Sequence, residues 1–173
     1  MKKQARNSTS KARVTALDLL TDQHREVEQL FDAVVKSEDL DDRGELCTEL
    51  CDKLAVHATI EEKIFYPGVK VEQTEDILQE SVEEHLQVKR LVADLLRMRP
   101  DDDTFLPAIK VLEEEVSHHV EEEEGELFPK VKKLFERAHL EALAQEMVAM
   151  VTELEGEEPR LNVPEEIDSA SPV

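Results

Sequence analysis

HATIEEKIFYP, residues 57–67, and HVEEEEGELFP, residues 119–129, follow one pattern. Each stretch begins with a His, has a Glu four residues later and a second Glu beside it, and reaches a Pro ten residues after the His. The first Glu of each pair is Glu61 or Glu123. Because residues four apart lie on the same face of an α-helix, each His and its Glu project in the same direction. The repeat therefore predicts two helices that present the same pair of polar side chains.

Apolar residues around this repeat recur with a helical period. Four long segments show the period, at residues 12–37, 42–66, 74–98 and 104–128. Trp is absent, only one Tyr is present, and Gly is rare, which is typical of a helical protein. Short connections between long helices make neighbours antiparallel. We predict an all-α protein: an antiparallel up-down-up-down four-helix bundle over residues 12–136, then a short fifth C-terminal helix over residues 137–155.

The ends and the overall charge limit the choice of partners. Residues 1–11 form a basic lead and residues 156–173 an acidic, Pro-containing tail, and both are predicted to be disordered. The chain has 42 acidic and 21 basic residues, a net charge of -21, which argues against binding to nucleic acid or to an anionic membrane. There is no long apolar run and no secretory signal, so we expect a cytoplasmic protein. Cys47 and Cys51 are too few for a disulfide scaffold and are predicted to pack at the edge of the apolar stripe, with a redox role as the alternative.

Each long predicted helix carries one His on its apolar face, and two of these faces also carry a Glu. An ionised carboxylate in a core is costly unless it is paired or bound to metal. Counted from the predicted loops at about 1.5 Å per residue, the four imidazoles fall in one layer to within a turn. We therefore predict that six side chains converge from four helices and ligate metal: His24, His57, Glu61, His85, His119 and Glu123.

The type of ligand indicates the type of metal. Imidazole and carboxylate without thiolate suit iron or manganese, and zinc also accepts them. Two carboxylates that can bridge suit two metal ions. Six protein ligands do not fill the coordination positions of two ions, so the pattern predicts open positions for water or a small molecule.

Other arrangements of the same residue types are open. His118 and Glu122 are also four apart, but they lie one step round the helix from the apolar stripe, which predicts a place at the boundary of the bundle. The stretches EVSH (115–118) and ERAH (136–139) have the Glu-x-x-His spacing of ferritin-like di-iron proteins, but the earlier helices contain no match. Tyr66 is expected either to pack in the core or to donate a hydrogen bond to the site.

The combined pattern resembles the hemerythrin-like proteins, specifically bacterial proteins with the HHE cation-binding domain. The similarity covers roughly residues 14–130 and consists of His24, His57-x3-Glu61-Glu62 before IFYP, His85, and His119-x3-Glu123-Glu124 before LFP. It implies a four-helix bundle with two non-haem iron ions, bridged by the two carboxylates and an oxo or hydroxo group. Manganese and zinc are the alternatives that fit less well.

The chain departs from the oxygen-carrying hemerythrins on the third helix. Those proteins use five His, with a His-x3-His pair there, whereas the residues four either side of His85 are Ser81 and Lys89. One imidazole is therefore missing, and Glu62, Glu84 or water are the candidates to replace it. The departure argues against reversible oxygen carriage and predicts an additional exchangeable position on the metal nearest His85.

The resemblance implies a di-iron protein that binds or reacts with oxygen, nitric oxide or hydrogen peroxide. Peroxide decomposition or oxidase activity would make it an enzyme, and the sequence leaves this open. The alternatives are an iron- or oxygen-responsive sensor or adaptor without turnover, an iron-storage or scavenging protein, and a bundle that has lost its metal. No feature of the sequence indicates a protein partner.

Overall fold

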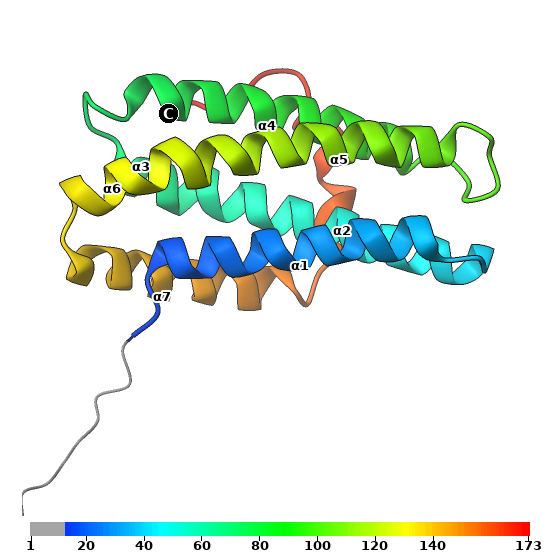
Figure 1. The fold of residues 1–173 in the computed structure, drawn as a ribbon, viewed down its shortest axis with the longest axis horizontal. Coiled ribbons are helices and arrows are strands. Elements are labelled where there is room, and N and C mark those ends of the chain that lie inside the picture. The colour runs from blue at the N-terminus through cyan, green and yellow to red at the C-terminus, as the bar shows by residue number, and fades with distance from the viewer. Residues whose placement is uncertain (1–12) are drawn as a thin grey trace, which may run out of the picture.

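The computed structural model describes residues 13–173 as a bundle of long helices (Figure 1). The predicted basic lead, residues 1–11, lies outside the described residues. The bundle consists of α1 (Ala16–Lys36), α2 (Leu40–Ile60), α4 (Glu75–Leu95) and α5 (Phe105–Glu122). Successive long helices run antiparallel, and the described residues contain no strand. The predicted all-α, up-down-up-down bundle is confirmed.

Side chains at the helix starts explain why the first two helices begin where they do. The Thr15 side chain accepts a hydrogen bond from the Asp18 N–H, and the Asp18 carboxylate accepts one from the Thr15 N–H. This reciprocal arrangement satisfies two backbone groups that the first turn would leave unpaired. At α2, the Asp39 carboxylate accepts from the N–H groups of Asp41 and Asp42. The polar residues before each apolar stripe therefore specify these starts locally.

A π-helical turn follows each of the two repeated His-x3-Glu pairs. The turn η1 (Glu61–Phe65) leads from α2 into α3 (Tyr66–Val69), and η2 (Glu123–Leu127) leads from α5 into α6 (Phe128–Leu134). Pro67 and Pro129 come directly after the first residue of α3 and of α6. In a regular α-helix a Pro ring collides with the carbonyl four residues earlier. The wider turn accommodates the ring, so the helix continues past Pro67 to Val69, whereas the sequence predicts a break at the Pro.

Two apolar clusters fill the bundle, one at each end. The first contains Val27, Phe31, Leu50, Val88, Val92, Ile109 and Leu112 among its buried residues. The second contains Leu20, Ile60, Phe65, Leu78, Val82, Leu127 and Val131. Along each long helix the His lies where one cluster gives way to the other. The predicted layer of imidazoles therefore separates two apolar halves of the core.

The last helix and the segment after it cover the bundle. Helix α7 (Arg137–Leu154) contacts α1 and α2, and lies beneath α1 in Figure 1. Residues 156–173, which we call the strap, form two 3-10 turns, η3 (Pro159–Leu161) and η4 (Val163–Glu165), that contact α2 and α4 respectively. This corrects the disordered tail predicted from the sequence.

Specific contacts explain why the strap is ordered despite its acidic composition. Val163 is buried in the first apolar cluster. Arg160 pairs with Asp52 of α2 at 2.7 Å, and Glu166 pairs with Lys89 of α4 at 3.0 Å. A basic side chain of the strap therefore neutralises an acid of the bundle, and a basic side chain of the bundle neutralises an acid of the strap. Composition alone predicted disorder because these partners lie far away in the sequence.

Two further sequence-based expectations concern the core and the surface. Cys47 and Cys51 are buried, carry free thiols and belong to the first apolar cluster, in agreement with the predicted packing role. Within residues 13–173, no helix has the length and apolar character needed to cross a membrane.

Candidate metal centre

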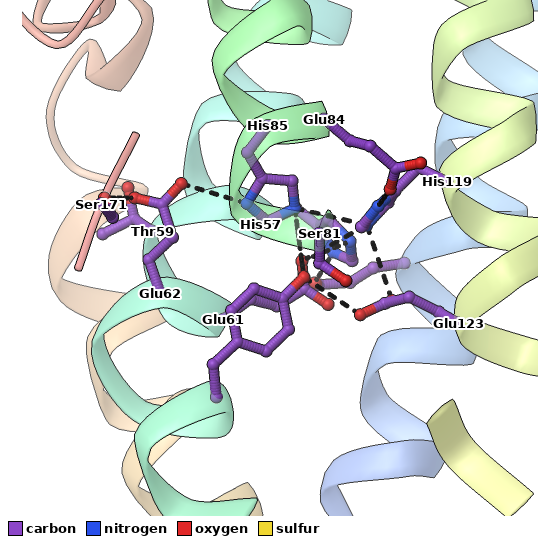
Figure 2. Close-up of polar contacts among 12 residues, drawn as sticks. His57, Thr59, Glu61, Glu62, Ser81, Glu84, His85, His119, Glu123 and Ser171 are labelled. Atoms are coloured by element: carbon purple, nitrogen blue, oxygen red, sulfur yellow. Dashed lines mark hydrogen bonds and ion pairs between the residues drawn. The ribbon is translucent and has the colours of Figure 1, made fainter. Parts of the chain in front are cut away.

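The structure brings all six predicted ligand residues together at the centre of the bundle. Each of their side chains is buried. They form two overlapping groups, whose potential ligand atoms lie within 4.8 Å of one another in each group: His24, His57, Glu61 and Glu123 in the first, and Glu61, His85 and His119 in the second. Figure 2 shows His57, His85, His119 and the two carboxylates around one space.

Both carboxylates reach histidines of both groups. One oxygen of Glu61, Oε2, lies 3.1 Å from Nε2 of His57 and 3.1 Å from Nε2 of His85. Oε2 of Glu123 lies 3.4 Å from Nε2 of His24 and 3.7 Å from Nε2 of His119. A carboxylate placed between two sets of imidazoles can bridge two metal ions, because it carries two oxygens. The geometry therefore suits two cations that share Glu61 and Glu123.

The other ring nitrogen of each of the four predicted ligand histidines is held by a polar side chain. The pairs and their distances are His24 Nδ1 with Glu124 (2.8 Å), His57 Nδ1 with Gln23 (2.8 Å), His85 Nδ1 with Glu62 (3.0 Å) and His119 Nδ1 with Glu84 (2.8 Å). An ionised carboxylate only accepts hydrogen bonds, so Nδ1 donates and Nε2 keeps its lone pair facing the centre. This is the arrangement in which an imidazole is oriented for metal binding.

These supporting residues follow the two-fold repeat of the sequence. Gln23, directly before His24, holds the His of the next helix, and Glu84, directly before His85, does the same in the second half. The Glu after each central carboxylate, Glu62 or Glu124, holds a His of another helix. The sequence suggested Glu62 and Glu84 only as replacement ligands and did not suggest Gln23 or Glu124. Alignment of the two halves was the signal that could have found them.

The three supporting carboxylates are ionised by their surroundings. Burial alone would raise the pKa of Glu62, but hydrogen bonds from His85, Lys89 and Ser171 outweigh it and lower the pKa to about 2. Burial also opposes ionisation of Glu84 and Glu124, and hydrogen bonds from the histidines they hold lower the pKa of both. Each is therefore an acceptor for an Nδ1–H group at neutral pH.

The central groups lack sufficient partners among the protein's own atoms. Of the buried side-chain nitrogens and oxygens without a hydrogen-bond partner in the described residues, four belong to the centre: His24 Nε2, His57 Nε2, Glu61 Oε1 and Glu123 Oε2. An unsatisfied buried polar group costs about 1–3 kcal/mol. These four atoms are all metal-ligand types that point into one space, so the residues present fit a cation cluster.

Charge at the centre leads to the same conclusion. Burial and the neighbouring Glu123 carboxylate raise the pKa of Glu61 well above its usual range. Burial would also raise the pKa of Glu123, but His119 and His24 outweigh it and lower the pKa. Burial and the nearby His24 lower the pKa of His57 well below its usual range. Protein groups alone thus do not stabilise both carboxylates as anions, whereas a bound cation would.

The Tyr66 hydroxyl contacts the centre, as one of the two sequence-based expectations for this residue had it. Its hydroxyl is 3.3 Å from Nε2 of His85 and donates a hydrogen bond to Oε1 of Glu123 at 3.1 Å. The π turn explains its direction, because its backbone bond joins residues five apart and Tyr66 is five residues after Glu61. Lys89, one of the positions considered for the fifth His, is instead paired with Glu62 at 2.9 Å.

The alternative histidines do not join the centre. The His118 side chain is 63% exposed and lies between Glu84 and Glu122 on the surface. His139 is exposed and its Nε2 is 2.7 Å from the backbone carbonyl oxygen of Gly68. The Glu-x-x-His spacing therefore does not build a second buried centre in the described residues.

Comparison with known protein families identifies the family of this chain. The family model described as the hemerythrin HHE cation binding domain matches residues 15–131. The chain belongs to the hemerythrin HHE cation-binding domain family. The matched range contains the whole buried centre, and the resemblance seen in the sequence is confirmed.

Individual relatives show how far the similarity extends. The chain is 27% identical over 138 residues to a DNA nickase of Nostoc sp.. The aligned region covers 80% of this chain and 39% of the nickase. The chain is 24% identical over 119 residues to an uncharacterised hemerythrin-like protein of Schizosaccharomyces pombe. This aligned region covers 67% of this chain and 59% of the relative. The chain thus spans less than two thirds of either relative.

A solved structure of an HHE domain shares the fold. The crystal structure of a hemerythrin HHE cation binding domain-containing protein of Mycobacterium kansasii superimposes with a TM-score of 0.74 at 23% identity. The match covers 83% of this chain and 88% of that one. It supports the helical bundle described above.

Proposed function

We propose that this HHE domain holds two non-haem iron ions and binds or reacts with a small ligand such as oxygen, nitric oxide or hydrogen peroxide. The observation that carries the proposal is the set of four inward Nε2 atoms around two shared carboxylates. Imidazole and carboxylate ligands without thiolate suit iron. His24 and His57 would hold one ion, His85 and His119 the other, and Glu61 and Glu123 would bridge them.

The surroundings of the four imidazoles favour a very small ligand. A cavity of about 20 Å³ adjoins the rings of all four ligand histidines, and its other walls are apolar, including Val27, Leu54 and Val116. A volume near 10–15 Å³ on the same scale holds one water molecule. The cavity therefore has room for a water or a diatomic molecule and excludes larger substrates.

The two irons would supply Lewis acidity and one-electron chemistry to that ligand. The chain's own side chains would orient the metal ligands and hold a proton near the centre. Tyr66 holds a proton on its hydroxyl between His85 and Glu123, and its oxygen would lie beside the metal that His85 holds, on the side of the imidazole layer opposite the apolar cavity. The supporting carboxylates fix the ring orientation of three histidines, and the apolar walls exclude bulk water.

Iron stoichiometry tests the proposal. Protein produced with iron should contain two irons per chain. Glu61→Gln and Glu123→Gln should each lose most of the iron, because loss of one bridge weakens both sites while the side-chain shape is kept. His118→Ala is the control and should retain both irons. Retention of two irons in both Glu variants would overturn the bridged centre.

Reactivity separates the proposal from oxygen carriage. With four histidines and a phenol in place of a fifth imidazole, we expect the oxidised protein to bind azide or to decompose peroxide. A stable, reversible oxygen complex of the unmodified protein would contradict this part of the proposal. DNA nicking, which the name of the Nostoc protein specifies, is not included, because a net charge of -21 repels the phosphate backbone.

A further inference from the structure

We propose that Glu84, His118 and Glu122 form a second, outer divalent-cation site on the surface between α4 and α5. Potential ligand atoms of these three side chains lie within 4.8 Å of one another. Nε2 of His118 is 3.7 Å from Oε1 of Glu84 and 3.4 Å from Oε1 of Glu122. Nitrogen and oxygen ligands bound at about 2.0–2.2 Å to one ion are separated by about 3–3.5 Å, so the three side chains need little movement to share a cation.

The helix places this outer set next to the inner one. His118 and Glu122 repeat the His-x3-Glu spacing of His119 and Glu123, shifted by one residue. One residue corresponds to about 100° around an α-helix, so the inner pair faces the core and the outer pair faces solvent. Glu84 of α4 completes the outer set, as Glu61 does for the inner one.

A comparison within the molecule indicates that a cation belongs beside Glu84. Three carboxylates hold the Nδ1 atoms of ligand histidines, and two of them have a fixed basic partner: Glu62 pairs with Lys89 at 2.9 Å, and Glu124 pairs with Arg25. In the described residues, Glu84 has no Lys or Arg partner and faces His118 and Glu122 instead. Glu62 and Glu124 occupy equivalent positions of the repeat, whereas the equivalent of Glu84 is the neutral Gln23. The negative charge of Glu84 is thus particular to the second half of the repeat, and the side chains that face it, His118 and Glu122, are cation ligands.

The ligand set indicates which cations would bind. One imidazole and two carboxylates suit zinc or another first-row divalent ion more than calcium, which prefers oxygen ligands alone. His118 is exposed, so water completes the coordination and exchange is rapid. The outer site is therefore expected to be weaker than the buried centre and to depend on the free cation concentration.

Glu84 would couple the two sites. Its Oε2 accepts from Nδ1 of His119 at 2.8 Å, while its Oε1 faces His118. A cation on Oε1 would withdraw negative charge from the carboxylate and weaken the bond that supports His119. This coupling rests on the proposed iron centre, whereas the outer site itself does not.

Zinc titration of the purified iron-containing protein, followed by equilibrium dialysis with measurement of both metals, tests the site. We expect one zinc per chain with iron unchanged, and at least tenfold weaker zinc binding in His118→Ala and Glu122→Gln. Glu121→Gln is the matched control, because the neighbouring Glu121 is exposed and removal of its charge leaves the three ligands intact. If Glu121→Gln weakens zinc binding as much as Glu122→Gln, or His118→Ala leaves it unchanged, the outer site is wrong.

Failure of the outer site and failure of the iron centre give different results. If the purified protein contains no iron, zinc also enters the buried centre, and the unmodified protein should then bind one more zinc than His118→Ala. In iron-containing protein, zinc should shift the iron absorption band of the unmodified chain and not that of His118→Ala. An identical band with and without saturating zinc would overturn the coupling through Glu84.

Discussion

Single residues make the two halves of the centre unequal. His24, His85 and His119 each donate Nδ1–H to a carboxylate, but His57 is paired with the amide oxygen of Gln23. A neutral acceptor makes the imidazole less basic than a carboxylate does. His57 would therefore be the weakest metal ligand of the four histidines. The second group also has the Tyr66 hydroxyl beside it. The two proposed metal positions would therefore differ in ligand strength although the sequence repeat makes them look equivalent.

The cap of α1 gives a pH-dependent prediction. Hydrogen bonds from the backbone and side chain of Thr15 lower the pKa of Asp18 below its ordinary value of 3.8. Since the unfolded chain then binds the proton more readily, the contribution of Asp18 is complete above that ordinary value and disappears as pH falls through the lowered one. Asp18→Asn should cost about 1 kcal/mol of unfolding free energy at pH 7 and progressively less as pH falls below 3.8.

Urea unfolding at several pH values measures this effect. Asp22→Asn removes a charge from the next turn of α1, where no cap bond exists, and serves as the control. A loss for Asp18→Asn that is the same at every pH would contradict the role of the ionised cap.

For single residues, the sequence predicted the six buried residues of the centre well, but it did not predict the side chains that hold the Nδ1 atoms of its histidines. A His or Glu on an apolar stripe is recognisable because periodicity alone shows that it faces the core. Gln23 and Glu124 lie at the edge of their helices, where polar residues are common, so periodicity does not distinguish them from solvent-exposed ones. For Tyr66 the sequence left core packing and a hydrogen bond to the site as alternatives, because its direction depends on the π turn, which a regular helical period does not predict.

At the scale of elements, the two π turns set the orientation of the helical segments α3 and α6, which come after the central carboxylates. Each turn begins at a central carboxylate, and the N–H of Tyr66 or Phe128 donates to the carbonyl of Glu61 or Glu123. The turns allow a helix to bring a His-x3-Glu pair to the core and then pass a Pro without ending. The repeated Pro, ten residues after each His, is the sequence signal for this irregular turn.

Two glycines near these turns have opposite surroundings and give a paired prediction. A Cβ at Gly68 would lie 2.5 Å from Cδ2 and 3.3 Å from Cγ of Leu143, so the buried side chain of α7 would have to move. Gly68→Ala should therefore cost about 1–3 kcal/mol. A Cβ at Gly125 meets no atom within 4 Å, so Gly125→Ala should stabilise by about 0.5–1 kcal/mol through lower backbone entropy of the unfolded chain.

Thermal unfolding of the two variants measures both effects, and each variant is the control for the other. Equal changes in melting temperature would show that packing of α7 against α3 does not decide the outcome. In the sequence, Gly68 lies in a predicted connection and Gly125 in a predicted helix, and neither position reveals what a Cβ would meet, so only the structure gives the two surroundings.

For the whole molecule, we predict that the polar layer between the two apolar clusters makes stability depend on the proposed metal centre. Without cations the layer leaves four buried atoms unpaired. Chelation of the iron should therefore remove several kcal/mol and lower the melting temperature by about 10 °C or more. The double variant Glu61→Gln, Glu123→Gln is the control, because a chelator should not change its melting temperature. An equal response of both proteins to the chelator would show that the centre does not contribute to folding.

The overall bundle was predictable from the sequence, whereas the strap was not. Helix number, order and direction follow from local periodicity and from short loops, which neighbouring residues determine. The strap depends on partners that composition does not reveal: Arg160 finds Asp52, and Glu166 finds Lys89. Acidic segments of this kind are predicted to be solvated unless the distant basic residues are known.

The strap also has a consequence for the order in which the chain folds. Its contacts join residues far apart in sequence, by 108 positions for Arg160 with Asp52 and by 109 for Ser171 with Glu62. Helical hairpins close short loops and form early, whereas contacts of large sequence separation form late. We therefore expect Ser171 to reach Glu62, and so the support of His85, only after the α1–α2 and α4–α5 hairpins have formed. The hydrogen-bond network around that histidine would then be completed as the strap closes over α2 and α4.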